Sequence, residues 1–365
     1  HQVEGGEQQD TEPAAVKKSG GLFRRLLLSL LIAVLLIGGA AFLAMQTLEQ
    51  RFNRPQEFSG QVFRIQKGDT PRSFARQLQK AGINDAAFGF DLLARYRGLA
   101  GKMHTGHYRF PDGRSLEEVL DSITSGKDRL SYTFTFVQGS TFKQLRESLA
   151  GAKSVDQTLE KLSDAEVLAL FDREQQYTHP EGLFFPETYA YDPGASDRDI
   201  LQRAYDMMQS TLDELWPERD TDIEIGTPYE ALILASIIEK ETALASERKQ
   251  ISGVFMNRLQ QGMKLQTDPT VIYGLGDQYD GNITRAHLKT DTPYNTYTRT
   301  GLPPTPISMP GRAAIEAALN PQATEAIYFV AKGDGSGGHT FSRTLSEHNK
   351  AVKKYLQNLR KSKQG

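Results

Sequence analysis

Glu239 is the residue whose type and position in this sequence best suit acid catalysis. It follows the run Ala231–Ile238, in which Ser236 is the polar exception. On a helix, Glu239 shares a stripe with mostly small residues, which leaves room for a ligand. Desolvation beside an apolar surface disfavours the charged form of a carboxyl group, and general acid catalysis requires the protonated form. The pattern therefore predicts that Glu239 donates a proton to a bound substrate.

A second interpretation places Glu239 at the solvated end of its helix. Glu239, Lys240 and Glu241 would then pair with one another or with Arg248. Glu241 falls over larger aliphatic residues that already fill the space beside it, so it suits an acid role less well than Glu239. The spacing by itself leaves both interpretations of Glu239 open.

The element that must position Glu239 is a helix beginning after Thr227. Thr227 is expected at the N-cap, Pro228 at the first helical position, and Glu230 as the partner in a capping box. The following residues are apolar on every side of the helix, which is typical of a buried helix. The sequence therefore predicts a buried central helix in the domain that contains Glu239.

Segment 262–311 gathers hydroxyl, amide and aromatic side chains on proline-stiffened turns. Such groups hydrogen-bond sugar hydroxyls and N-acetyl groups and stack on sugar rings. Polar loops are common, and Asp268 before Pro269 also fits a plain helix N-cap. The side chains predicted to hold a sugar chain are Gln266, Asp268, Tyr294, Asn295 and Tyr297, with Glu181 as a further one from the segment PEGLFFPETY.

Residues 179–195 are too rich in proline, glycine and aromatic residues for one helix and are expected to form a structured loop. Its aromatic side chains could stack on sugars or pack in a core, and the sequence favours neither. These side chains are Phe184, Phe185, Tyr189 and Tyr191.

Four long blocks resemble the endolytic murein transglycosylases, the YceG-like family, in that family's order. They are ASIIEKETA, RLQQGMKLQTDPTVIYG, YNTYTRTGLPPTPISMPG and YFVAKGDGSGGHTFSRTLSEHN. In that family the first Glu of the EKET block is the catalytic acid, which corresponds to Glu239. The resemblance implies cleavage of the bond between N-acetylmuramic acid and N-acetylglucosamine in peptidoglycan glycan strands, with 1,6-anhydro ends and no metal or organic cofactor. It also implies a role in ending glycan elongation, with peptidoglycan synthases as protein partners.

Other functions stay open. A glycoside hydrolase of the same substrate would use Asp268 or Glu241 as a second carboxylate. A metal-dependent amidase would need His339 and His348, but the HExxH pattern is missing from the sequence. The third alternative is a noncatalytic scaffold that binds glycan.

The N-terminal part of the sequence predicts a membrane anchor. Residues 22–47 contain an uncharged run from Leu26 to Met45, which is long enough to span a bilayer. More positive charge precedes the run than follows it, so the N-terminus is expected in the cytoplasm and the catalytic domain in the periplasm, on the inner membrane. A cleaved signal peptide is the alternative. Residues 1–21 are polar and are expected to be a disordered cytoplasmic tail.

The rest of the sequence predicts two α+β parts. Three segments repeat a short strand, a turn with glycine and a capped amphipathic helix, with caps at Thr70, Ser115 and Thr141. Residues 55–130 are expected to form a small module that is similar to LysM through KGDTPRSFARQL, and residues 131–360 a larger catalytic domain. With 43 basic and 45 acidic residues, no overall field favours nucleic acid, and the lack of cysteine excludes thiol chemistry.

Overall fold

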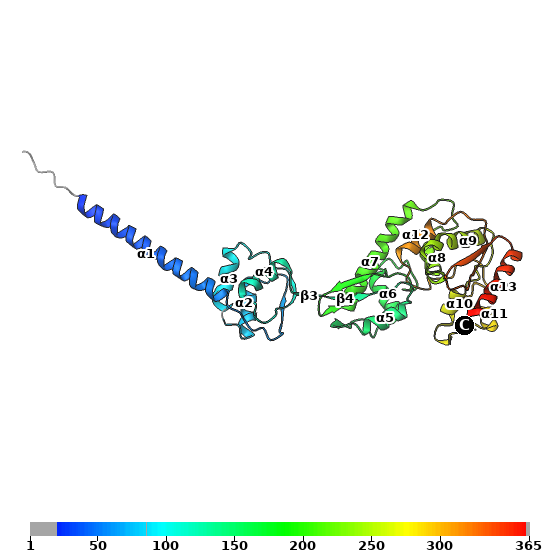
Figure 1. The fold of residues 1–365 in the computed structure, drawn as a ribbon, viewed down its shortest axis with the longest axis horizontal. Coiled ribbons are helices and arrows are strands. Elements are labelled where there is room, and N and C mark those ends of the chain that lie inside the picture. Colours follow the sequence, from blue (N-terminus) through cyan, green and yellow to red (C-terminus); the bar gives the residue numbers. More distant parts are fainter. Residues whose placement is uncertain (1–19, 85, 363–365) are drawn as a thin grey trace, which may run out of the picture. The chain divides into compact units, whose positions relative to one another are not determined.

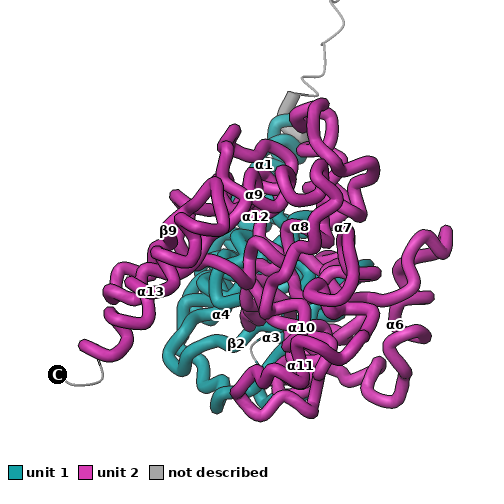
Figure 2. The backbone as a smooth tube through the Cα atoms, turned by 90° about the vertical axis from the view of Figure 1, so that its right-hand side faces the viewer, with its two compact units in different colours: residues 1–130 teal, residues 131–365 magenta. Residues whose placement is uncertain are grey.

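The structure is a computed structural model that describes residues 20–84 and 86–362 (Figure 1). The chain divides into two compact units, residues 1–130 and 131–365 (Figure 2). Both units mix helices with small sheets, and helices predominate. The expectation of an α+β protein is thus confirmed at the level of fold class.

Helix α1 (Gly20–Phe52) opens unit 1 and carries the long apolar run. The stretch Arg24–Phe52 is long and apolar enough to cross a membrane, and its apolar residues are exposed. The helix ends in the module that follows, where Phe52 is only 3% exposed. Most of the tail expected over residues 1–21 lies outside the described residues. Gly20 and Gly21 belong to α1 and not to that tail, because the helix starts before the apolar run does.

The remainder of unit 1 packs three helices against a three-stranded antiparallel sheet with the order β1-β2-β3. Phe63 and Ile65 lie on the buried face of the first strand, as their alternation predicts. Capping boxes at Thr70 and Ser115 start two of the helices, since each side chain accepts a hydrogen bond from the backbone three residues ahead. The elements are β1 (Val62–Ile65), α2 (Pro71–Lys80), α3 (Ala86–Tyr96), β2 (Gly106–Arg109), α4 (Leu116–Ser125) and β3 (Arg129–Leu130).

The first half of unit 2 joins two small sheets to three helices. The elements are β4 (Tyr132–Thr135), α5 (Phe142–Ala150), β5 (Val155–Asp156), α6 (Asp164–Phe171), β6 (Thr188–Tyr191), β7 (Ala195–Ser196), α7 (Asp197–Leu215) and the short 3-10 helix η1 (Trp216–Glu218). The strand of the third predicted repeat segment, β4, pairs with β6, which lies more than 50 residues later in the chain. The helix of the same segment, α5, begins with the expected capping box at Thr141. β4 pairs antiparallel with β6, and β5 pairs parallel with β7.

The second half of unit 2 is built around one buried helix and ends in a β-hairpin and a long helix. The elements are α8 (Pro228–Glu241), η2 (Ala245–Glu247), α9 (Arg248–Gln260), α10 (Asp268–Leu275), η3 (Gly276–Gln278), α11 (Arg285–Lys289), α12 (Arg312–Leu319), β8 (Tyr328–Ala331), β9 (His339–Ser342) and α13 (Leu345–Ser362). β8 and β9 form the antiparallel hairpin.

Helix α8 is the buried central helix that the sequence predicts. Thr227 caps it in a box with Glu230, and every residue from Ala231 to Ile238 is buried. Helices α9 and α12 pack against α8 and against each other (Figure 1). Because α8 is enclosed along its length, its last turn is held at a fixed place, and Glu239 belongs to that turn.

The aromatic segment 179–195 packs in the hydrophobic core of unit 2. Its four large aromatic side chains are each at most 9% exposed and belong to the main hydrophobic cluster, and part of the segment is strand β6. These rings therefore pack in the core, and their faces are not open to a sugar. The four residues are Phe184, Phe185, Tyr189 and Tyr191.

Candidate functional site

Glu239 has its carboxylate between two donors from elsewhere in unit 2. Its Oε1 accepts a hydrogen bond from Arg248 Nη2 at 3.2 Å, and its Oε2 accepts one from the Gly311 backbone N–H at 2.9 Å. The side chain of Glu239 is 7% exposed and that of Arg248 is 13% exposed. The pairing with Arg248 that the second interpretation considered is thus present, but Glu239 is enclosed and not at a solvated helix end.

The segment that leads to Gly311 is fastened to α8 through Ser236. Ile307 N–H donates to Ser236 Oγ at 3.0 Å, and Ser308 Oγ donates to the Ser236 carbonyl oxygen at 3.1 Å. The small-residue face of α8 below Glu239 is therefore occupied by the protein's own backbone. The room for a ligand expected along that face is absent there, because a segment 71 residues away along the chain fills it.

A tight turn before α5 runs along the other side of Glu239. Gly139 has a φ of 76°, its N–H donates to the Met309 carbonyl at 2.8 Å, and its carbonyl accepts from Lys240 Nζ at 3.1 Å. A Cβ atom placed on Gly139 would lie 3.7 Å from Glu239 Cγ. Glycine suits this position because its backbone has a positive φ and passes close to the carboxylic side chain.

A cavity of about 640 Å³ opens beside the N-terminus of α5. Two residues predicted to hold a sugar, Glu181 and Tyr294, line it together with Tyr273 and His179. The Tyr273 and Tyr294 rings meet edge to face with centroids 4.9 Å apart. The cavity therefore combines aromatic walls with carboxylate, hydroxyl and imidazole groups, the mixture that recognises sugars.

Glu181 is the most deeply buried carboxyl group in this cavity, at 2% exposure. Its two oxygens accept from the Phe142 backbone N–H at 3.0 and 3.1 Å, and Oε2 also accepts from Tyr273 Oη at 3.1 Å. Burial raises the pKa of Glu181 to about 7, and these hydrogen bonds only partly oppose that rise. A carboxyl group with such a pKa can hold or release a proton near neutral pH.

The pH dependence of stability should reveal Glu181. Its pKa is raised above the ordinary value of 4.5, so its contribution to stability is present below about pH 4.5 and is lost as the pH rises through 7. We expect Glu181→Gln, which mimics the protonated form, to match the wild type at pH 5. At pH 8 the variant should be more stable by up to roughly 3 kcal/mol. Denaturant unfolding at the two pH values measures this.

The control for this comparison is Glu147→Gln, because Glu147 lines the same cavity but is exposed. Its difference from the wild type should not change with pH. A Glu181→Gln variant whose stability stays parallel to that of the wild type between pH 5 and 8 would contradict the raised pKa.

The cavity and Glu239 are connected by one short segment. A Cβ atom on Gly139 would lie 3.7 Å from Glu239 Cγ, and Phe142, three residues later, donates its N–H to Glu181. Three residues span at most about 11 Å. The segment before Gly311 also passes near both carboxyl groups, since Gly311 N–H donates to Glu239 and a Cβ atom on Gly182 would clash with Pro306. Two segments therefore run between Glu239 and Glu181, although the sequence separates these residues by 58 positions.

The other residues predicted to hold a sugar do not line this cavity. They form a separate group or stabilise turns. Tyr297 Oη donates to Asp268 Oδ1 at 2.6 Å, which joins these two residues. Asn295 is 1% exposed, and its amide donates to three backbone carbonyls of residues 287–290, so it stabilises the fold of that loop. Gln266 Oε1 accepts from Arg258 at 3.4 Å. The N-cap of α10 is Thr267, one residue before Asp268.

Glu241 lies on the side of α8 away from Arg248 and Gly311, the two donors to Glu239. It accepts a short hydrogen bond from Thr267 Oγ1, and burial raises its pKa to about 7, with Asp268 adding to the rise. Glu241 therefore belongs to the group around Asp268 and Tyr297. Glu241 is enclosed, as expected from the larger aliphatic residues beside it.

The structure adds three residues that sequence reasoning did not select for the site. Gly311 and Tyr273 lie in the family blocks, and Arg248 follows Glu239 by nine residues. His339, considered as a metal ligand, pairs through Nδ1 with Glu247 Oε2 at 2.7 Å, and its N–H donates to Glu247 Oε1 at 3.0 Å. His348 stacks on Tyr328 instead of facing His339.

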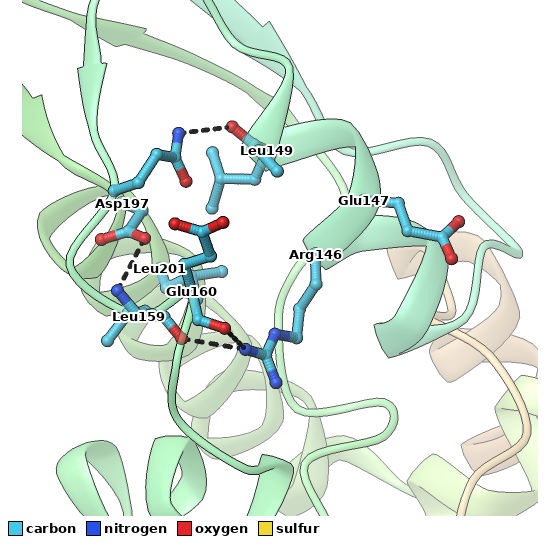
Figure 3. A pocket seen from close by; sticks show the side chains of 9 residues that line it. Arg146, Glu147, Leu149, Leu159, Glu160, Asp197 and Leu201 are labelled. Carbon is cyan, nitrogen blue, oxygen red and sulfur yellow. Dashed lines mark hydrogen bonds between the residues drawn. The ribbon is translucent and has the colours of Figure 1, made fainter.

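A second cavity, of about 220 Å³, lies between α5 and the start of α7 (Figure 3). Its polar groups are bonded to one another: Asp197 accepts from the N–H of Leu159, and Arg146 donates to the carbonyls of Leu159 and Glu160. These bonds fasten the connection between β5 and α6. The cavity is therefore explained by local folding, and it does not include Glu239 or Glu181.

Comparison with known proteins places the chain among relatives of one kind. The model of the YceG-like family matches residues 63–354. A Bacillus subtilis protein named endolytic murein transglycosylase is 32% identical over 336 residues, which are 88% of this chain and 91% of that protein. A Streptococcus pneumoniae protein of the same name is 27% identical over 325 residues, 80% of this chain and 58% of that protein.

A solved structure is also similar. A yceG-like protein from Listeria monocytogenes aligns with 80% of this chain and 98% of its own, at 29% identity and a TM-score of 0.49. The family match covers most of the chain, including Glu239, Gly311, Arg248 and the cavity around Glu181. On the extent of this match and the identity to the Bacillus subtilis protein, the chain belongs to the YceG-like family.

Proposed function

We propose that this chain is an endolytic peptidoglycan lytic transglycosylase with Glu239 as its catalytic acid and base. The observation that carries the proposal is the enclosed carboxyl group of Glu239 at the end of a buried helix, in a family whose relatives are named for this activity. The substrate is the glycan strand of peptidoglycan, and the bond cleaved is the β-1,4 bond between N-acetylmuramic acid and N-acetylglucosamine.

The reaction needs one carboxyl group because the substrate brings its own nucleophile. Protonated Glu239 gives its proton to the glycosidic oxygen while the bond from that oxygen to the muramyl C1 breaks. The resulting carboxylate then takes the proton of the muramyl C6 hydroxyl while that oxygen forms its bond to C1. The product carries a 1,6-anhydro ring, no water is consumed, and Glu239 ends the cycle protonated.

The cavity around Glu181 is the part of the site that we assign to holding the sugar chain. Tyr273 and Tyr294 offer ring faces and hydroxyl groups, and Glu181 offers oxygens for sugar hydroxyls. The short segment shared with Glu239 would bring a sugar held there within reach of the acid. Gln266, Asp268, Asn295 and Tyr297 complete the predicted set of sugar-holding residues, with Asn295 acting through the fold of its loop.

We further propose that α1 anchors the enzyme in the inner membrane with its N-terminus in the cytoplasm. The length and apolar surface of α1 support this. Unit 2 would then act in the periplasm near nascent strands, where a cut ends or trims elongation and where peptidoglycan synthases are available as partners. Residues 55–130 stay a LysM-like module by sequence resemblance, and glycan binding by that module is part of the proposal.

Product chemistry tests the proposed reaction. Purified peptidoglycan incubated with the full chain in detergent should release fragments with 1,6-anhydromuramyl ends, because the C6 hydroxyl displaces the leaving sugar. Mass spectrometry separates these ends from reducing ends, which are heavier by one water. Reducing ends would show hydrolysis with a second carboxylate, and glycan binding without release of fragments would show a scaffold.

A further inference from the structure

Arg248 and the Gly311 backbone between them occupy both carboxyl oxygens of Glu239. Arg248 Nη2 lies 3.2 Å from Glu239 Oε1, while Gly311 N–H holds Oε2. Both groups are donors without any acceptor capacity. The site as described therefore fits the carboxylate, which is the form of Glu239 that exists between the two proton transfers.

Among the residues that the structure describes, the charged groups on the neighbouring elements, Arg248 apart, have other partners than Glu239. On α8, Lys240 bonds the Gly139 carbonyl and Glu241 bonds Thr267. Before α9, Glu247 pairs with His339. At the start of α12, Arg312 bonds carboxylates on α7 and on its own helix. Arg248 is thus the cation placed to pair with the carboxylate of Glu239.

The position of Arg248 is fixed by the residue before it, and its side chain keeps a spare donor. Glu247 is held by both the backbone N–H and the ring nitrogen of His339 on the β8–β9 hairpin. Arg248 Nε is buried and has no hydrogen-bond partner among the residues that the structure describes. The backbone is therefore anchored, while the guanidinium group bonds the Glu239 side chain and, in the described part of the chain, leaves Nε without a partner.

We propose that Arg248 is a positioning residue that stabilises the carboxylate of Glu239 between proton donation and proton recovery. The inference rests on the proposed function. A cation beside the carboxylate pairs the negative charge that remains on Glu239 after it has donated its proton.

Loss of this pairing gives a kinetic signature that loss of structure would not produce. In Arg248→Met, kcat should fall by about 10- to 100-fold, because the carboxylate is no longer paired. KM should change much less, because Arg248 contacts Glu239. Arg248→Lys keeps the charge and should restore most of the wild-type kcat.

The experiment measures kcat and KM for release of anhydromuramyl fragments by the full chain in detergent, from pH 4.5 to 9. Arg343→Met is the matched control, because Arg343 forms an exposed ion pair with Glu325; its profile should coincide with that of the wild type. An Arg248→Met variant with the kcat of the wild type, or an Arg248→Lys variant as slow as Arg248→Met, overturns the inference. If the wild type itself makes no anhydro ends, the proposed function fails and not this inference alone.

Discussion

Replacing Glu239 with glutamine should reduce the release of anhydromuramyl fragments by about 100- to 10,000-fold, the range expected when a general acid and base is removed. Glutamine has nearly the same size but cannot donate or recover the proton at neutral pH. Its amide would keep one of the two contacts, to Gly311 or to Arg248, and would turn its NH₂ group toward the other donor. The loss should appear in kcat, with a smaller change in KM.

Two controls decide whether this loss reports chemistry. Glu224→Gln changes an exposed carboxylate outside the site and should leave the rate of fragment release unaltered. Glu239→Gln should lose some stability, because its NH₂ group faces a donor, but its unfolding should remain one cooperative transition, which shows that the site is still assembled. Full lytic activity in the glutamine variant would remove Glu239 from the mechanism.

Replacing Arg258 with methionine should destabilise unit 2 by about 3–5 kcal/mol, the largest stability effect that we expect. Arg258 is 7% exposed and donates to the carbonyls of Ile327, Lys264 and Leu265 at 2.6–3.1 Å. Methionine fills part of the volume but leaves one buried carbonyl, that of Leu265, and two part-buried carbonyls without their donor, and each unsatisfied buried group costs about 1–3 kcal/mol. The link between α9, the loop after it and the hairpin would loosen.

The single tryptophan of the sequence makes this measurement specific. Trp216 packs on the core of unit 2, so its fluorescence during denaturant unfolding follows that unit and not unit 1. Arg343→Met removes an arginine of an exposed ion pair and should change the free energy of unfolding by less than about 1 kcal/mol. An Arg258→Met variant as stable as this control would show that the carbonyls find other donors.

Features that depend on a few consecutive residues could be predicted from the sequence. The capping boxes at Ser115, Thr141 and Thr227 depend on side chains and backbone groups three residues apart, so the sequence contains all of the information. Burial of α8 follows equally from its continuous apolar run. The apolar length of α1 is also a local property, and a helix that could span a membrane is present there.

Features that depend on distant segments could not be read in the same way. The face of α8 below Glu239 looks open from its small residues, but Ser236 holds a segment that arrives 71 residues later. Whether the aromatic residues around Phe184 face sugars or the core depends on the packing of α5 and α7, which no local pattern encodes. The contact of Arg248 with Glu239 likewise depends on the turn through η2.

The junction of α1 with unit 1 has a practical consequence for making a soluble form of this protein. The ring of Phe52 fills space beside Gly89, and Leu48 packs on the same cluster. A truncation that removes the chain through Phe52 would leave a cavity among the aromatic rings of unit 1. A recombinant fragment that begins shortly before Leu48 keeps both packing residues. It lacks most of the exposed apolar surface of α1, which is the surface that would require detergent.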